Sequence, residues 1–202
     1  MHITIVSGSH REISQSIKVA KFCQKVLLQQ NPSHSVSILS LAENPLPLWD
    51  EGVWDKTPEW KKLWGPMSHQ LAQSDAIVVV APEWSGMCPS GLKNLFLLCS
   101  NAELAHKPGL IVGISSTTGG AYPVSELRSH SGKNTRLVYI PDHVIIRYVE
   151  KVLVSELPAS PEDEYIRSRI EYSLRVLVKY GEALRLIRDG DVIDLKKFPN
   201  GM

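Results

Sequence analysis

Short runs of apolar, β-branched residues recur along this chain and alternate with longer segments of helical periodicity. Residues 77–81 and 110–114 are almost continuously apolar, as is typical of strands buried on both faces of a parallel sheet. Five βα units in series predict an α/β fold with an open, doubly wound sheet of five parallel strands and helices on both faces. The expected strands are residues 3–7, 35–39, 76–80, 110–115 and 136–140.

Helical segments are expected in the gaps between these strands. Residues 19–27 carry apolar side chains at i, i+3, i+4, i+7 and i+8, which forms one face of a helix. The last helix is the best marked, because Ser160 and Pro161 suit its first positions and an apolar stripe continues to about residue 187. Segments of helix length also occupy residues 57–73, 90–104 and 119–131.

Length and charge limit the function classes. The chain has 202 residues, so we expect a single domain over residues 1–202. Its 22 Lys and Arg residues against 21 Asp and Glu leave a net charge of +1, which predicts no nucleic-acid or anionic-membrane partner. No apolar run approaches the roughly 18 residues of a membrane span, and the first residues lack the basic region of a secretory signal.

The cysteines and histidines predict neither disulfides nor a metal site. Cys23, Cys88 and Cys99 form no C-x-x-C pair, and scattered cysteines of odd number fit a reducing cytoplasm. The seven histidines show no H-x-x-x-H spacing, so no metal is expected. We read Cys88 as a small packing residue, since no neighbour in the sequence marks an activated thiolate.

The first expected strand runs into a loop that is rich in small hydroxyl residues. Backbone N–H groups at a helix N-terminus, serine hydroxyls and an arginine together form an anion site. The loop matches neither the G-x-G-x-x-G dinucleotide motif nor the P-loop. A second interpretation, in which serines only cap the following helix, stays open. The candidate residues are Ser9, Arg11, Ser14, Gln15 and Ser16.

Two further loops follow the third and fourth expected strands. In open α/β sheets, ligands bind beyond the carboxyl ends of the strands where the strand order reverses, so all three loops are expected at one site. The loop at residues 82–86 is rich in turn-forming residues and carries an aromatic ring, which suits the rim of a flat ligand. The candidate residues in the two loops are Pro82, Glu83, Trp84, Ser85, Gly86, Ser115, Ser116, Thr117, Gly119 and Gly120.

These loops resemble the NADPH-dependent FMN reductase family of flavodoxin-like proteins, which includes quinone, azo-dye and chromate reductases. Residues 8–14 match its G-S-x-R-x-x-S start, and residues 82–94 match most of its P-E-Y-N-x-x-x-P-x-x-L-K-N motif. Its G-G and L-R pairs are matched by Gly119-Gly120 and Leu127-Arg128. The resemblance covers about residues 1–140. Trp84, Ser85 and Leu97 depart from the Tyr, Asn and Asp that are common in the family.

The resemblance implies a flavodoxin-like fold and a role for each loop. The first loop holds the FMN phosphate, residues 82–86 line the isoalloxazine edge, and residues 115–120 close its other side. It also implies hydride transfer from NADPH or NADH to FMN and then to a small-molecule electron acceptor. The flavin carries this chemistry, so no catalytic acid or base is assigned. We expect a homodimer or homotetramer.

Two other functions stay open. The first is a flavodoxin-like electron carrier, although the near-zero net charge and Arg11 count against it. The second is a catalytically degenerate protein that binds flavin without turnover, which the unusual Trp84 and Ser85 favour. For Glu83, a loop carboxylate that binds local backbone is favoured over a catalytic one.

Two stretches do not fit the plain alternation of strands and helices. Residues 44–66 hold four of the five tryptophans. In one interpretation these rings form an aromatic lid or an oligomer surface; in the other they cover one sheet edge within the monomer. Residues 142–158 are expected to form an apolar insertion before the last helix. Either stretch is a candidate for contact with a second subunit.

Overall fold

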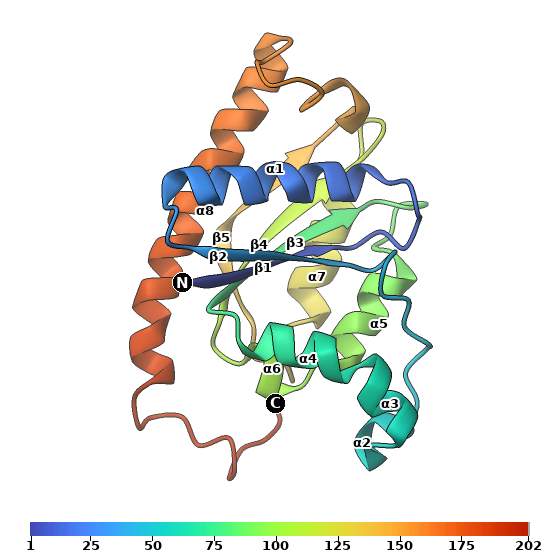
Figure 1. Ribbon diagram of the computed structural model, residues 1–202, viewed down its shortest axis with the longest axis vertical. Helices are drawn as coiled ribbons and strands as arrows, with labels where there is room; N and C mark the ends of the chain where they lie inside the picture. Colours follow the sequence, from blue (N-terminus) through green and yellow to red (C-terminus); the bar gives the residue numbers. More distant parts are fainter. Residues whose placement is uncertain (202) are drawn as a thin grey trace.

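A five-stranded parallel sheet forms the centre of the molecule in the computed structural model, which describes residues 1–201 (Figure 1). The strand order is β2-β1-β3-β4-β5, and the direction of winding reverses between β1 and β3. This is the flavodoxin-like order, so the predicted fold class is confirmed. The strands are β1 (His2–Ser7), β2 (Ser35–Ser40), β3 (Ala76–Pro82), β4 (Pro108–Ile114) and β5 (Val138–Ile146).

Helices cover both faces of this sheet (Figure 1). On one face, α1 (Gln15–Gln30) and α8 (Pro161–Arg188) pack over Val78 and Val80 of β3. The other face packs against α4 (Gly65–Ala72), α5 (Ser90–Leu98) and α7 (Ala121–His130). Shorter elements are α2 (Gly52–Asp55), α3 (Pro58–Leu63), α6 (Asn101–Leu104) and the 3-10 helix η1 (Val149–Lys151). Within residues 1–201, no helix combines the length and apolar character needed to cross a membrane.

The fifth strand is longer than expected. The prediction that it spans residues 136–140 and is followed by an insertion over 142–158 is wrong, because β5 continues to Ile146. Its pairing with β4 shifts register between Gly109 and Ile111, and the irregular stretch contains Pro141, which has no N–H for the ladder. The Arg128 guanidinium donates to the carbonyls of Ile140 and Pro141 at 2.8 and 3.1 Å, and so supports this irregular stretch.

Two expected helices are divided. The segment 57–73 forms α3 and α4, which meet at Trp64. The segment 90–104 forms α5 and α6, because Ser100 and Glu103 build a capping box that starts a new helix.

The tryptophan-rich stretch packs largely within the monomer. Trp60 and Trp64 are buried in the core on the α4 and α5 side of the sheet, so the interpretation as a cover within the monomer is confirmed for these two rings. Trp54 is 72% exposed and contacts Trp49 edge to face, with 4.8 Å between ring centroids. The side-chain oxygen of the buried Asn94 accepts the backbone N–H of Trp49 at 2.8 Å and thereby fixes the stretch to α5.

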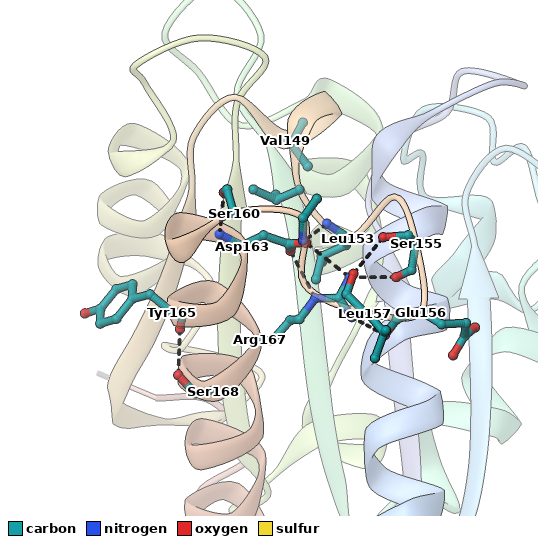
Figure 2. A network of polar contacts seen from close by, with 12 residues as sticks. Val149, Leu153, Ser155, Glu156, Leu157, Ser160, Asp163, Tyr165, Arg167 and Ser168 are labelled. Atoms are coloured by element: carbon teal, nitrogen blue, oxygen red, sulfur yellow. Dashed lines mark hydrogen bonds and ion pairs between the residues drawn. The ribbon is translucent and has the colours of Figure 1, made fainter.

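A buried ion pair fixes the loop between η1 and α8 (Figure 2). The Asp163 carboxylate is fully buried in the first turn of α8 and accepts the N–H groups of Leu153 and Ala159 at 2.9 and 3.0 Å. Its Oδ1 lies 3.1 Å from Nε of Arg167, which also donates to two carbonyls of the same loop. Burial alone would raise the pKa of Asp163, but these hydrogen bonds and the Arg167 charge outweigh it and lower the pKa below its ordinary value.

We expect Asp163→Asn to lower the free energy of unfolding at pH 7 by about 3–5 kcal/mol, because it leaves the Arg167 charge unpaired in the interior. The depressed pKa means that the carboxylate stabilises the fold above its unfolded pKa of about 3.9, and that this contribution is lost as pH falls through the folded pKa. Urea denaturation at a series of pH values from 7 into the acid range should therefore show the free energies of unfolding of the wild-type protein and Asp163→Asn converging as the pH falls. The control Glu182→Gln, which removes an exposed ion pair with Lys179, should change the free energy of unfolding little. A difference between wild-type protein and Asp163→Asn that does not depend on pH would contradict this account.

Candidate functional site

The carboxyl ends of β1, β3 and β4 bring the three polar loops around one pocket of about 140 Å³. Three residues outside the predicted set, Ile114, Val149 and Glu150, complete its lining. The predicted residues that line it are Ser9, Arg11, Ser14, Gln15, Ser16, Pro82, Glu83, Trp84, Ser115 and Ser116. The predicted residues that lie beside it rather than in its lining are Ser85, Gly86, Thr117, Gly119 and Gly120.

The start of α1 has hydrogen-bond donors available for an anion. Ser14 occupies the N-cap position, but its side chain makes no capping hydrogen bond, and no acidic residue lies in the first turn. The first N–H groups of a helix have no partner inside the helix. The Ser16 hydroxyl is buried and has no hydrogen-bond partner among the described residues. Together with Arg11, these groups form a set of donors suited to an anion such as a phosphate group. The capping interpretation is wrong for Ser14, because its side chain makes no capping hydrogen bond.

Lys18 fixes the part of the pocket wall that was not predicted from the sequence, which is formed by Val149 and Glu150. Its Nζ donates to the carbonyls of Val149 and Val152 at 2.6 and 2.8 Å, which ties η1 to α1. Burial lowers the pKa of Lys18, and the nearby Glu150 and Asp163 carboxylates oppose that shift. These contacts join residues more than 130 positions apart, so no local pattern in the sequence points to them.

The Glu83 carboxylate joins the second loop to the third. Its Oε2 accepts the N–H groups of Gly120 and Tyr122 at 2.6 and 3.3 Å, and its own N–H donates to Ile114 O at 2.9 Å. A negative charge at the start of α7 also suits the helix dipole. Glu83 binds backbone as predicted, but the prediction that this backbone is local is wrong, because the N–H groups belong to the third loop.

A residue without a Cβ is required at both Gly119 and Gly120 of the third loop, for a different structural reason at each position. A Cβ at Gly119 would overlap the Glu83 carboxylate. Gly120 has φ +101°, a conformation that side chains with a Cβ rarely adopt. The glycines therefore shape the contact with Glu83.

Ser85 and Gly86 form a tight turn at the tip of the second loop. Trp84 and Met87 exchange both backbone hydrogen bonds at 2.9 Å, and the two residues between them have φ of +49° and +73°. Positive φ at both central positions is typical of type I′ turns, in which Asn and Gly are favoured. The His10 ring contacts Trp84 edge to face, with 4.6 Å between centroids, and links the first loop to the second.

Cys88 is not an activated nucleophile. Burial and the Glu126 carboxylate raise the pKa of its thiol to about 12, so it stays protonated at neutral pH. The same carboxylate accepts the Cys88 N–H at 3.1 Å and pairs with Lys93 at 2.9 Å. Across residues 1–201, no group of three or more His, Cys, Asp and Glu residues could hold a metal ion.

Comparison with known proteins adds a family and a fold. The model of the NADPH-dependent FMN reductase family matches residues 1–151. A quinone reductase of Pseudomonas putida is 27% identical over 124 residues, which cover 59% of this chain and 63% of that protein. The chain therefore aligns with less than two thirds of that relative's length.

Two solved structures share the fold. FerB, a flavoenzyme NAD(P)H:(acceptor) oxidoreductase from Paracoccus denitrificans, superposes with a TM-score of 0.69 at 18% identity, covering 90% of this chain and 97% of FerB. An oxidoreductase from Corynebacterium diphtheriae gives a TM-score of 0.63 at 14% identity, covering 90% and 97% of the two chains. At these identities the likeness establishes the fold alone.

The contact between Glu83 and Gly119 predicts non-additive substitutions. Gly119→Ala should destabilise the protein by about 1–3 kcal/mol, because its Cβ overlaps the Glu83 carboxylate. In a Glu83→Ala background the overlap is gone, so the same substitution should cost much less. Urea denaturation of the four proteins measures the coupling. Gly132→Ala is the matched control, since its Cβ would meet only Leu137 O at 3.5 Å; an equal cost of Gly119→Ala in both backgrounds would refute the contact.

Proposed function

This chain belongs to the NADPH-dependent FMN reductase family, and on that basis we propose that it is an FMN-dependent oxidoreductase that uses NADPH or NADH. When bound, FMN would take a hydride from NAD(P)H and pass the electrons to a small acceptor such as a free flavin, a quinone, an azo compound or a metal oxyanion. The protein supplies the binding and orientation of these reactants, and no side chain is assigned as a catalytic acid or base.

The unpartnered, buried Ser16 hydroxyl at the start of α1 carries this proposal. It is a hydrogen-bond donor without an acceptor among residues 1–201, next to uncapped helix N–H groups and the charge of Arg11. A phosphate group satisfies all of these donors at once. The residues proposed to hold it are Ser9, Arg11, Ser14, Gln15 and Ser16.

The second and third loops are proposed to hold the isoalloxazine ring between them. Residues 82–86 would contact one edge and residues 115–120 the other, largely through backbone atoms. The Glu83 carboxylate binds the N–H groups of Gly120 and Tyr122, so it keeps the two loops at a fixed separation. A site held in this way is organised before the ring arrives, which reduces the entropy lost on binding.

A flavin-binding protein without turnover is the second candidate. Trp84 packs against His10 at the edge of the pocket, and Ser85 holds a left-handed conformation that Asn would adopt more readily. At both positions this chain departs from the residue that is common in the family. Tight binding of FMN without oxidation of NAD(P)H would favour this candidate.

We further propose that residues 1–202 act as one domain in a cytoplasmic homodimer or homotetramer. The outer face of α8 carries a groove with a largely apolar surface, which supports self-association; it is lined by Tyr172, Arg175, Val176, Lys179, Tyr180 and Ala183. Three cysteine thiols are free, which fits a reducing compartment.

Titration of FMN into the purified protein, followed by flavin fluorescence, tests the phosphate site. We expect Arg11→Gln and Ser16→Ala each to weaken FMN binding by about 10-fold or more, because each removes a hydrogen bond to a charged group. Lys21→Gln, an exposed charge on the same helix, should leave the affinity unchanged. Wild-type protein should then oxidise NAD(P)H with a quinone. Failure to bind FMN would overturn the proposal.

Light scattering after size-exclusion chromatography tests the assembly. Tyr172→Lys adds a third cation to a groove that Arg175 and Lys179 already line and should shift the protein toward monomer, because a buried interface tolerates unpaired like charges poorly. Leu48→Glu alters a residue of the tryptophan-rich stretch that is 77% exposed and should leave the assembly unchanged. Dissociation by Leu48→Glu alone would assign the interface to that stretch instead.

A further inference from the structure

A larger cavity of about 630 Å³ lies between β5, η1 and the start of α8, beside the pocket proposed for FMN. Ile145, Val152 and Ile166 are buried or half-buried and give it an apolar floor. Tyr148 and Tyr165 are more exposed and line its opening. A floor of this kind with aromatic rings at its edge suits a planar, apolar group.

One turn of the chain separates this cavity from the pocket proposed for FMN. Val149 and Glu150 line the FMN pocket, whereas Arg147, Tyr148 and Lys151 line the larger cavity. The turn is held to the third loop, since the Tyr148 N–H donates to Thr117 O and the Val149 N–H donates to Ser115 O, both at 3.0 Å. A ligand long enough to cross this turn can therefore occupy both cavities.

Arg147 and Lys151 give the larger cavity two cations. Arg147 Nε donates to Thr118 O at 2.6 Å, and its two terminal nitrogens have no hydrogen-bond partner among residues 1–201. Lys151 Nζ lies 5.2 Å from the centroid of the Tyr148 ring. Glu162 adds one carboxylate to the lining; it lies in the first turn of α8, where hydrogen bonds from its own N–H and from the Ser160 hydroxyl lower its pKa. The cations therefore exceed the carboxylates by one.

We propose that this cavity binds the adenosine end of NADPH, with Arg147 and Lys151 on the 2′-phosphate and the purine over the apolar floor. Guanidinium and ammonium groups are the usual partners of phosphate. This inference depends on the proposed function, because the nicotinamide end must reach the FMN pocket. The donor carries its reactive ring at one end and a purine with phosphates at the other, so it suits two cavities, whereas a small acceptor needs only the first.

The 2′-phosphate makes the proposal testable by comparing NADPH with NADH. Arg147→Gln and Lys151→Gln should each lower kcat/KM for NADPH by about 10-fold, mainly through KM, because each loses a contact to a charged group. For NADH, kcat/KM with the same quinone should change less than about 2-fold. FMN affinity should not change. Arg147→Lys keeps the positive charge and should therefore lose less kcat/KM for NADPH than Arg147→Gln does. Lys62→Gln, which removes an exposed charge on α3, should leave kcat/KM for NADPH unchanged.

Calorimetry provides a readout that does not depend on turnover. Adenosine 2′,5′-bisphosphate should bind FMN-loaded wild-type protein about 10-fold more tightly than adenosine 5′-monophosphate. The double variant Arg147→Gln/Lys151→Gln should bind the two nucleotides alike.

Three outcomes would overturn the inference. The first is an equal loss of activity with NADPH and NADH while FMN stays bound. The second is equal affinity of wild-type protein for the two adenosine nucleotides. The third is an effect of Arg147→Gln confined to a sulfonated azo acceptor, which would assign the cavity to the acceptor. A wild-type protein that binds no FMN would instead overturn the proposed function.

Discussion

The structure depends on burying a parallel sheet under helices on both faces. Every residue of β3 and β4 is buried, and alternate side chains of β3 enter the two separate cores. Such strands have no room for polar side chains along their length. Along β3 and β4, polar residues are instead found in the loops that follow the strands, and the reversal of strand order between β1 and β3 opens a space there. The location of the site thus follows from the way the core is built.

Three polar contacts then fix the loops around that space. The Glu83 carboxylate binds the start of α7, the Lys18 ammonium binds η1, and the Asp163–Arg167 pair holds the loop before α8. Each contact places a charged group against backbone N–H or C=O groups that would otherwise lack partners. Because charge-assisted hydrogen bonds are strong and directional, they hold the loops in one arrangement. The loops can therefore be polar and still be ordered before any ligand binds.

Periodicity predicted the five strands and an open parallel sheet, because a strand buried on both faces leaves a local, nearly continuous apolar pattern; the flavodoxin-like class was implied by the family resemblance. The same reasoning missed the end of β5, since Pro141 interrupts a strand whose pairing recovers on the other side of an irregular stretch. Ten residues predicted for the site line its pocket, because they lie directly after the strands. Val149 and Glu150 were missed, since Lys18 brings them there from more than 130 positions away. Asn94 and Arg128, which belong to the family motif, fix backbone rather than line the pocket.

The buried Asp163–Arg167 pair is better explained by its role in positioning the loop before α8 than by a gain in the stability of the fold. Placing two charges in the interior costs desolvation energy, and apolar residues of similar volume often stabilise a fold as well or better. Apolar residues could not bind the N–H groups of Leu153 and Ala159 or the carbonyls of the same loop. That loop follows the turn that carries Val149 and Glu150 on one side and Arg147 and Lys151 on the other. The ion pair thus helps to hold the wall between the two cavities, so the same contacts that start α8 also set the separation of the FMN and nucleotide sites that we propose.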